Sequence, residues 1–147
     1  MNSIVVACGS CGKKNRIPAE KQHMGPKCGS CGSLIDMGRA AVPVELDDST
    51  LAPFISQASL PVLVDFFSPT CGPCHMMSPI IDNLAKQFIG RVIIAKLDTS
   101  RNRTAPAQYN IRGVPTLIFF KHGRVADQMT GAMPEEALSL KLHQLIK

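Results

Sequence analysis

The five-residue sequence CGSCG occurs twice in this chain of 147 residues, at positions 8–12 and 28–32. Sixteen residues separate Cys11 from Cys28, a spacing typical of zinc sites with four cysteines. A tight turn can bring both sulfurs of a pair to one metal ion, because Gly12 and Gly32 allow the backbone to turn with a positive φ angle. Zinc prefers such soft ligands in a closed tetrahedral site, where backbone N–H groups can point at the thiolates. The predicted metal ligands are Cys8, Cys11, Cys28 and Cys31.

The residues between the two pairs, KKNRIPAEKQHMGPK, include only two large apolar side chains, Ile17 and Met24. A segment of about 35 residues with this composition cannot bury enough apolar surface to fold unaided. We therefore expect residues 1–38 to form an N-terminal module whose core is one structural zinc ion. Iron in place of zinc and two structural disulfides are alternatives compatible with the same spacing. His23 is not expected as a ligand, because four cysteines already complete the site.

Positive charge is concentrated in the first 40 residues, where six Lys and Arg residues accompany two acids and give +4, against +1 for the remainder. Four thiolates on one Zn²⁺ would reduce this charge to about +2, so the segment is weak evidence for nucleic-acid binding. No apolar run approaches the about 18 residues of a membrane helix, and the N-terminus lacks the basic start and long apolar region of a signal peptide. We therefore expect a mature, cytoplasmic, monomeric protein with no membrane or nucleic-acid partner. In that compartment thiols stay reduced and paired cysteines indicate metal binding or catalysis.

The segment IDMGRAAVPVELDDS, residues 35–49, is expected to be a hinge into a second unit, the C-terminal domain of residues 39–147. Gly38 breaks the chain, and Pro43 marks a short strand of the kind found at a sheet edge. The residues DDS supply N-caps for a helix over 49–58. The N-terminal module and the C-terminal domain are expected to have separate cores.

A third pair of cysteines has a different setting. The sequence LPVLVDFFS, residues 60–68, predicts a strand buried on both faces of a parallel sheet, and residues 75–90 have the apolar spacing of a helix. Cys71 therefore lies where a strand ends and a helix begins, and the free N–H groups of the helix N-terminus favour its thiolate. Cys74 lies one turn inside the helix and is shielded. Pro73 stiffens the first turn but offers no N–H to a metal-bound thiolate, so this pair indicates chemistry rather than metal binding.

The rest of the chain predicts a mixed α/β architecture. We expect a strand over 91–100, a short helix over 103–110, a β-hairpin over 111–133 with its turn at His122 and Gly123, and an amphipathic helix over 133–147. A β-α-β unit followed by a hairpin and a terminal helix gives a mixed sheet flanked by helices.

Four sequences, VDFFSPTCGPCHMMSPIID, AKLDTSRN, YNIRGVPTLIFFKHGRV and TGAM, resemble the thioredoxin family over residues 41–147. With the two N-terminal pairs, the whole chain resembles the zinc-binding thioredoxins of the thioredoxin-2 type. The resemblance implies the thioredoxin fold, with Cys71 as the attacking thiol and Cys74 as the resolving thiol. It also implies that Asp65 is a buried acid, that Lys96 lies near it, and that Pro115 is a cis-proline facing the dithiol. The implied substrate groove comprises Thr70, Gly72, Pro73, Val114 and Gly131.

Two departures from the family pattern concern the surroundings of Cys71. Thr70 replaces the usual tryptophan before the first cysteine, and Phe67 replaces a second tryptophan further upstream. His75 replaces the usual Lys or Arg after the second cysteine, so the local charge should depend on pH. We expect these changes to affect partner recognition.

The resemblance implies a protein-disulfide reductase that acts on disulfide-containing proteins. Its electrons would come from a thioredoxin reductase that uses NADPH and flavin, and the chain itself would carry no redox cofactor. Alternatives are a disulfide oxidase or isomerase on the same fold, a zinc-dependent redox sensor or holdase, and a zinc-ribbon adaptor that binds protein or nucleic acid.

Overall fold

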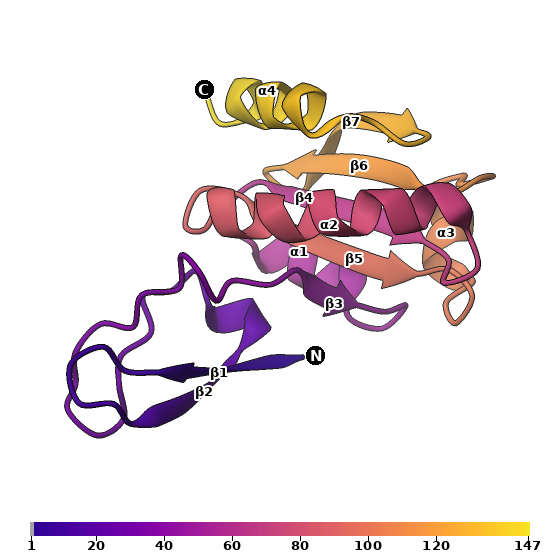
Figure 1. The fold of residues 1–147 in the computed structure, drawn as a ribbon. Coiled ribbons are helices and arrows are strands. Elements are labelled where there is room, and N and C mark those ends of the chain that lie inside the picture. The colour runs from indigo at the N-terminus through magenta and orange to yellow at the C-terminus, as the bar shows by residue number, and fades with distance from the viewer. Residues whose placement is uncertain (1) are drawn as a thin grey trace.

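The computed structural model describes residues 2–147, which form two sheets (Figure 1). In the N-terminal module, β1 (Ser3–Ala7) and β2 (Lys14–Pro18) form an antiparallel hairpin, followed by a short 3₁₀ helix, η1 (Ala19–Lys21). This hairpin was not predicted from the sequence. The first CGSCG sequence forms its turn, so the pairing of β1 with β2 fixes Cys8 and Cys11 relative to the chain that leads to the second pair.

The C-terminal domain is built on a five-stranded sheet with the order β3-β5-β4-β6-β7. Its strands are β3 (Val44–Leu46), β4 (Val62–Phe67), β5 (Ile93–Asp98), β6 (Thr116–Lys121) and β7 (Arg124–Thr130). The first three in spatial order run parallel, and β6 and β7 run antiparallel to their neighbours. The β6–β7 turn is at His122 and Gly123, as predicted, with φ angles of 54° and 76° that suit the twist of a tight hairpin. The sheet is therefore mixed, as expected.

Helices cover both faces of this sheet: α2 lies in front of it and α1 and α3 lie behind it in Figure 1. The helices are α1 (Leu51–Gln57), α2 (Gly72–Gln87), α3 (Thr104–Gln108) and α4 (Glu135–Leu145). Side chains of β4 alternate between the two cores, since Leu63 packs with α2 and α4 whereas Val64 and Phe66 pack on the side of α1 and α3. Both faces of β4 are thus buried, as the continuous apolar run predicted. None of the helices in the described part of the chain is long and apolar enough to cross a bilayer.

The prediction of two separate cores holds only in part. The N-terminal module has its own small cluster, which includes Cys8, Cys28 and Ile17, but Ile89 of the C-terminal domain packs against it. Conversely, Ala19 of η1 is fully buried in the core of the C-terminal domain. Large apolar side chains are scarce in the module, so it gains burial by docking against the domain instead of standing apart.

The segment expected to be a hinge is fixed by hydrogen bonds. The side chain of Gln22, which is 2% exposed, donates to the Val42 carbonyl at 2.7 Å and accepts from the Val42 N–H at 3.1 Å. The side chain of Asn2 donates to the Pro43 carbonyl at 3.1 Å and accepts from the Glu45 N–H at 3.2 Å. Residues 42–45 are therefore held to the N-terminal module on both sides of Pro43.

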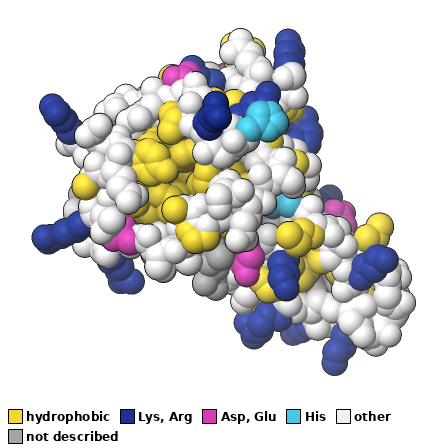
Figure 2. All heavy atoms as spheres, turned by 180° about the vertical axis from the view of Figure 1, so that it is seen from behind, with side chains coloured by type: hydrophobic (Ala, Val, Ile, Leu, Met, Phe, Trp, Pro, Cys, Tyr) yellow, Lys and Arg dark blue, Asp and Glu magenta, His cyan; other side chains and the backbone are white. Residues whose placement is uncertain are grey.

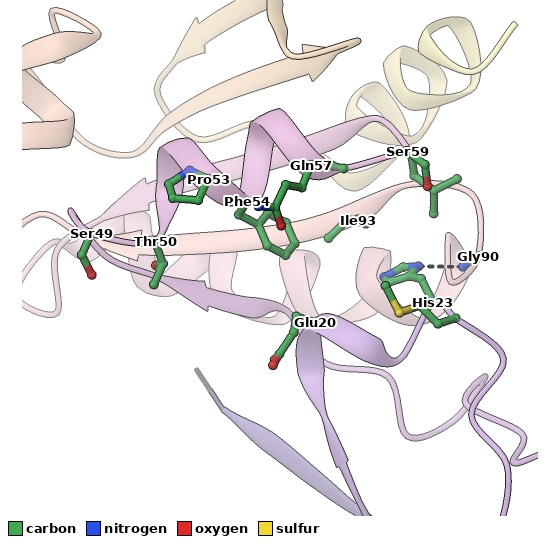
Figure 3. A pocket seen from close by; sticks show the side chains of 13 residues that line it. Glu20, His23, Ser49, Thr50, Pro53, Phe54, Gln57, Ser59, Gly90 and Ile93 are labelled. Atoms are coloured by element: carbon green, nitrogen blue, oxygen red, sulfur yellow. Dashed lines mark hydrogen bonds between the residues drawn. The ribbon is translucent and has the colours of Figure 1, made fainter.

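His23 makes a further contact between the two parts. Its Nδ1 accepts a hydrogen bond from the Gly90 N–H at 2.9 Å, which Figure 3 shows as a dashed line. Burial lowers the pKa of His23 to about 4. The ring is thus neutral at physiological pH, as an acceptor at Nδ1 requires, and it serves the docking of the module rather than a metal ion.

Candidate functional site

Cys71 and Cys74 occupy the positions that the sequence predicted, at the junction of β4 with α2. Cys71 is the N-cap residue of α2, and its Sγ accepts a hydrogen bond from the Cys74 N–H at 3.2 Å. The Cys71 thiol also donates to the Val114 carbonyl, at a distance of 3.6 Å. Cys71 is half-buried, whereas Cys74 is 5% exposed. A reagent at the surface therefore meets Cys71 first, where the helix N-terminus stabilises negative charge on sulfur.

Cys74 needs a base before its sulfur can react. Burial, together with the hydrogen bond from Cys71, raises the pKa of the Cys74 thiol to about 11. At neutral pH this thiol is protonated, and the thiolate is the nucleophilic form. A group that accepts its proton must therefore lie within reach.

Asp65 is a buried carboxyl group that lines the same cavity as Cys74. It lies in β4, is 3% exposed, and its Oδ1 has no hydrogen-bond partner within residues 2–147. Burial raises the pKa of Asp65 to about 7, and the positive charge of Lys96 opposes part of this rise. The carboxyl group can therefore take up and release a proton near neutral pH.

A small cavity connects this carboxyl group with the inner thiol. The cavity has a volume of about 30 Å³, and Asp65, Cys74 and Lys96 are among the residues that line it. One water molecule needs roughly 10–15 Å³ of such space and two or more polar partners. The cavity thus has room for water to carry a proton between the thiol of Cys74 and the carboxyl group of Asp65.

Lys96 lies beside Asp65 but is turned towards solvent. Its Nζ is 3.9 Å from Glu45 Oε1 and 5.7 Å from the centre of the Phe67 ring. Lys96 was predicted from the sequence, whereas Glu45 was not. The only sequence signal for Glu45 was a charged residue within the short apolar strand VEL.

The residues predicted to form a groove gather around Cys71. The Val114–Pro115 peptide bond is cis, as the resemblance implied. The Gly131 N–H donates to the Pro115 carbonyl at 2.8 Å, and Gly131 has a φ of 100°. The structure thereby brings segments from α2, the start of β6 and the end of β7 to one place. Thr70, Gly72 and Pro73 are exposed beside these segments.

His75 and Met76 add features that sequence reasoning did not assign. The Nε2 of His75 is 2.6 Å from the Pro69 carbonyl oxygen, so the ring folds back over the loop before Cys71. Met76 is 69% exposed on the same turn of α2. An exposed methionine in the first turns of α2 offers adaptable apolar contact to a partner.

The four N-terminal cysteines form a second site. Their ligand atoms all lie within 4.8 Å of one another, and the Sγ–Sγ distances of Cys8 to Cys31 and Cys11 to Cys28 are both 3.6 Å. Four thiolates about 2.3 Å from a central zinc ion stand about 3.8 Å apart, so the observed spacing fits a tetrahedral metal site. All six cysteines of the chain are free thiols, which is not the arrangement of the structural-disulfide alternative.

Backbone turns support these sulfurs as predicted. Gly12 and Gly32 both have a φ of 78°. The Ser10 N–H points at Cys8 Sγ and the Ser30 N–H at Cys28 Sγ, each at 3.4 Å. These donors stabilise negative charge on the ligands.

Asn15 links the two turns and was missed in the sequence. Its amide donates to Cys28 Sγ at 3.5 Å and to the Lys13 carbonyl at 3.0 Å, and its Oδ1 accepts from the Gly29 N–H at 3.0 Å. A single polar residue in a polar loop gives no sequence signal for such a role.

A larger hollow, of about 420 Å³, lies between the N-terminal module and α1. His23 lines one side of it, and Pro53 and Phe54 line the other (Figure 3). Met24 and Leu60 also belong to the lining. The lining runs from Ser49 and Thr50, at the start of α1, to Leu60, just before β4, so the hollow follows the length of α1. From behind, apolar side chains gather in a hollow of the C-terminal domain, while Lys and Arg side chains are spread around the outline of the molecule (Figure 2).

Two sequence models of protein families match the chain: "Thioredoxin" over residues 42–144 and "Thioredoxin 2, N-terminal", a zinc ribbon, over residues 7–33. Thioredoxin C-3 of Corynebacterium nephridii is 36% identical over 144 residues, which cover 98% of this chain and 97% of that protein. Thioredoxin 1 of Nostoc sp. is 40% identical over 100 residues, covering 68% and 94%. A solved structure of a mutant thioredoxin from Halobacterium salinarum superposes with a TM-score of 0.66 at 31% identity, covering 72% of this chain and 92% of that one.

Proposed function

This chain belongs to the thioredoxin family of thiol–disulfide oxidoreductases, and we propose that it reduces disulfide bonds of protein substrates through Cys71 and Cys74. The observation that carries the proposal is the arrangement around the dithiol. A half-buried cysteine caps a helix above a buried one, and a carboxyl group with its pKa raised to about 7 lies across a water-sized cavity.

In the first step, the Cys71 thiolate attacks one sulfur of the substrate disulfide. A bond forms between Cys71 Sγ and that sulfur, the substrate S–S bond breaks, and the second substrate sulfur leaves as a thiolate that takes a proton from water. The Cys74 N–H, 3.2 Å from Cys71 Sγ, favours the attacking thiolate.

In the second step, Cys74 resolves the mixed disulfide. Its proton passes through water in the cavity to Asp65, and the Cys74 thiolate attacks Cys71 Sγ. The remaining substrate sulfur leaves as a thiolate and is protonated, so two electrons have passed from the dithiol to the substrate. The hydrogen bond and charge of Cys71 contribute to the high pKa of Cys74 in the dithiol. Consumption of the Cys71 thiolate in the first step removes these contributions, which helps Cys74 to lose its proton.

The resulting disulfide must be reduced for another cycle. By family membership we assign this step to a thioredoxin reductase that uses NADPH and flavin, and we propose that the chain carries no redox cofactor of its own. We propose the cytoplasm as the compartment, since a reductase requires a reducing environment.

Substrates would bind along the groove formed by Thr70, Gly72, Pro73, Val114 and Gly131, with the backbone at Pro115 facing the dithiol. Exposure of Thr70, the residue before Cys71, supports this placement. Thr70 leaves this surface without the flat aromatic side chain that the family usually places there.

For the N-terminal module, residues 1–38, we propose one structural zinc ion held by Cys8, Cys11, Cys28 and Cys31. The metal would stabilise the fold of the module and would take no part in disulfide exchange. The tetrahedral spacing of the sulfurs and the match to the zinc-ribbon model support this assignment.

Trapping of intermediates tests the dithiol mechanism. Cys74→Ser should accumulate mixed disulfides with a protein substrate, because the resolving thiol is gone, whereas Cys71→Ser should form none. Alkylation of the wild-type dithiol should be faster at Cys71 than at Cys74. Equal alkylation rates across the pH range, or mixed disulfides on Cys74, would refute these roles. A reduction potential of about −270 mV supports a reductase, whereas a value of about −120 mV would indicate an oxidase.

A further inference from the structure

Three charged side chains form a row across three neighbouring parallel strands. Glu45 of β3 pairs in register with Lys96 of β5, and Lys96 pairs in register with Asp65 of β4. Their neighbours in sequence, such as Val44 and Val64, belong to the core on the side of α1 and α3. Since side chains alternate along a strand, all three charged groups project to the other face, which α2 covers below the dithiol.

Exposure increases steadily along this row. Asp65 is 3% exposed, the Lys96 side chain is 30% exposed, and the Glu45 side chain is 58% exposed. The ammonium group of Lys96 therefore lies between a buried carboxyl group and one in solvent. It is 3.9 Å from Glu45 Oε1, whereas Asp65 Oδ1 lacks any hydrogen-bond partner in residues 2–147. The side-chain oxygen of Asn2 accepts a hydrogen bond from the Glu45 N–H and so fixes the backbone at this end of the row.

We propose that Glu45 is a positioning residue of the redox site, which holds the Lys96 ammonium group on the solvent side and so leaves the buried oxygen of Asp65 without a direct cationic partner. An unpartnered carboxyl group keeps its proton to higher pH than one that is ion-paired. Glu45 thereby sets the pH at which Asp65 can exchange a proton with Cys74. This inference rests on the proposed role of Asp65.

The other charged groups near Asp65 do not bring a positive charge into the cavity that it shares with Cys74. Cys74 and Asp82 of α2 line the shared cavity, but neither supplies positive charge. Asp98, at the end of β5, pairs with Arg101 at 3.9 Å, and Arg101 does not line that cavity. Among the residues that line the cavity, Lys96 is the one cation, so its position decides how strongly the Asp65 carboxylate is stabilised.

NMR titration of the Asp65 carboxyl group tests the inference in the full-length, zinc-loaded dithiol form. In Glu45→Gln the released ammonium group can approach Asp65 and stabilise its carboxylate, so the titration midpoint should fall. We expect the midpoint to fall by about one pH unit. This is the lower end of the decrease in carboxyl pKa that a cation within about 4–6 Å produces. Glu136→Gln, which removes an exposed acid from the first turn of α4, is the matched charge control and should leave the midpoint unchanged.

Two further variants distinguish two ways in which Glu45 could change the titration midpoint of Asp65. One is its contact with Lys96, and the other is the direct effect of its negative charge on Asp65. Glu45→Asp keeps the charge, but its shorter side chain cannot span a contact that is already 3.9 Å long, so its midpoint should also fall. In a Lys96→Met background, Glu45→Gln should have no effect, because the proposed action passes through Lys96. An unchanged midpoint in Glu45→Gln, a wild-type midpoint in Glu45→Asp, or a shift that persists without Lys96 would each overturn the inference.

A failure of the proposed role of Asp65 in disulfide exchange can be distinguished from a failure of the proposed role of Glu45. If Asp65 does not accept the Cys74 proton, Asp65→Asn will leave the rate of disulfide exchange and its pH profile unchanged. The titration of the Asp65 carboxyl group in the Glu45 variants would still decide whether Glu45 positions Lys96.

Discussion

Replacement of Asp65 by Asn should stabilise the protein, and the gain should grow with pH. Burial raises the pKa of Asp65 to about 7 in the folded protein, whereas the pKa of an aspartate in an unfolded chain is about 3.9. Between these values the folded protein holds a proton that the unfolded chain releases. The stability that this group contributes is therefore fully present below about pH 4 and is lost as the pH rises through about 7.

The size of the effect follows from the difference between the two pKa values. Each unit corresponds to about 1.4 kcal/mol, so about three units amount to about 4 kcal/mol of lost stability above pH 7. No reduction for solvent screening is needed, because Asp65 is only 3% exposed. Asn has nearly the shape of the protonated acid and cannot ionise, so Asp65→Asn should recover this free energy.

Urea unfolding of the zinc-loaded dithiol form at two pH values measures the gain. We expect the free energy of unfolding of Asp65→Asn to exceed that of the wild type by about 2 kcal/mol at pH 5.5 and by about 4 kcal/mol at pH 8.5. Asp127→Asn is a suitable control, because hydrogen bonding to Lys141 lowers the pKa of Asp127 and its loss should bring no such gain. A gain that does not change with pH would show that Asp65 ionises normally and would refute the reasoning.

Three other predictions concern the metal site, the docking of the module and the mouth of the groove. Elemental analysis of Cys71→Ser/Cys74→Ser should still find about one metal ion per chain, and loss of the metal would overturn the assignment to the N-terminal cysteines. Gln22→Leu leaves the N–H and carbonyl of Val42 unpaired, so urea unfolding should show a loss of about 1–3 kcal/mol; unchanged stability would mean that these bonds do not hold the module. Thr70→Trp should change stability by no more than about 0.5 kcal/mol, because the position is exposed, but should alter kcat/KM with protein disulfides or the reductase. Unchanged kinetics with a large loss of stability would place Thr70 in the interior.

The features that sequence reasoning predicted well are those with a local cause. The continuous apolar run around Asp65 marked β4, and the apolar spacing after Cys74 marked α2. The repeated CGSCG sequences marked four cysteines that the structure gathers into one cluster. In each case neighbouring residues carry the whole signal.

The missed features depend on contacts between distant segments. In β2, Ile17 is the only large apolar residue, so the hairpin of the module has no alternating pattern to reveal it. Gln22 is one polar residue among many in its segment, and only the fold shows that its amide meets Val42. The row from Glu45 to Asp65 requires β5 to lie between β3 and β4, an order that differs from their order in the chain.

The amide groups of Asn2 and Gln22 cover part of the outer edge of the sheet, at Glu45 of β3 and at the two residues just before that strand. β3 is the outermost strand on its side of the sheet, and each amide supplies one donor and one acceptor to the backbone of residues 42–45. An outer strand with unpaired N–H and carbonyl groups is a template for pairing with another chain. A chain that began at residue 39 would leave these groups bare, along with the apolar surface that Ala19 covers. The N-terminal module therefore also keeps this edge of the sheet from pairing with a strand of another molecule. A C-terminal domain produced without the module is expected to aggregate.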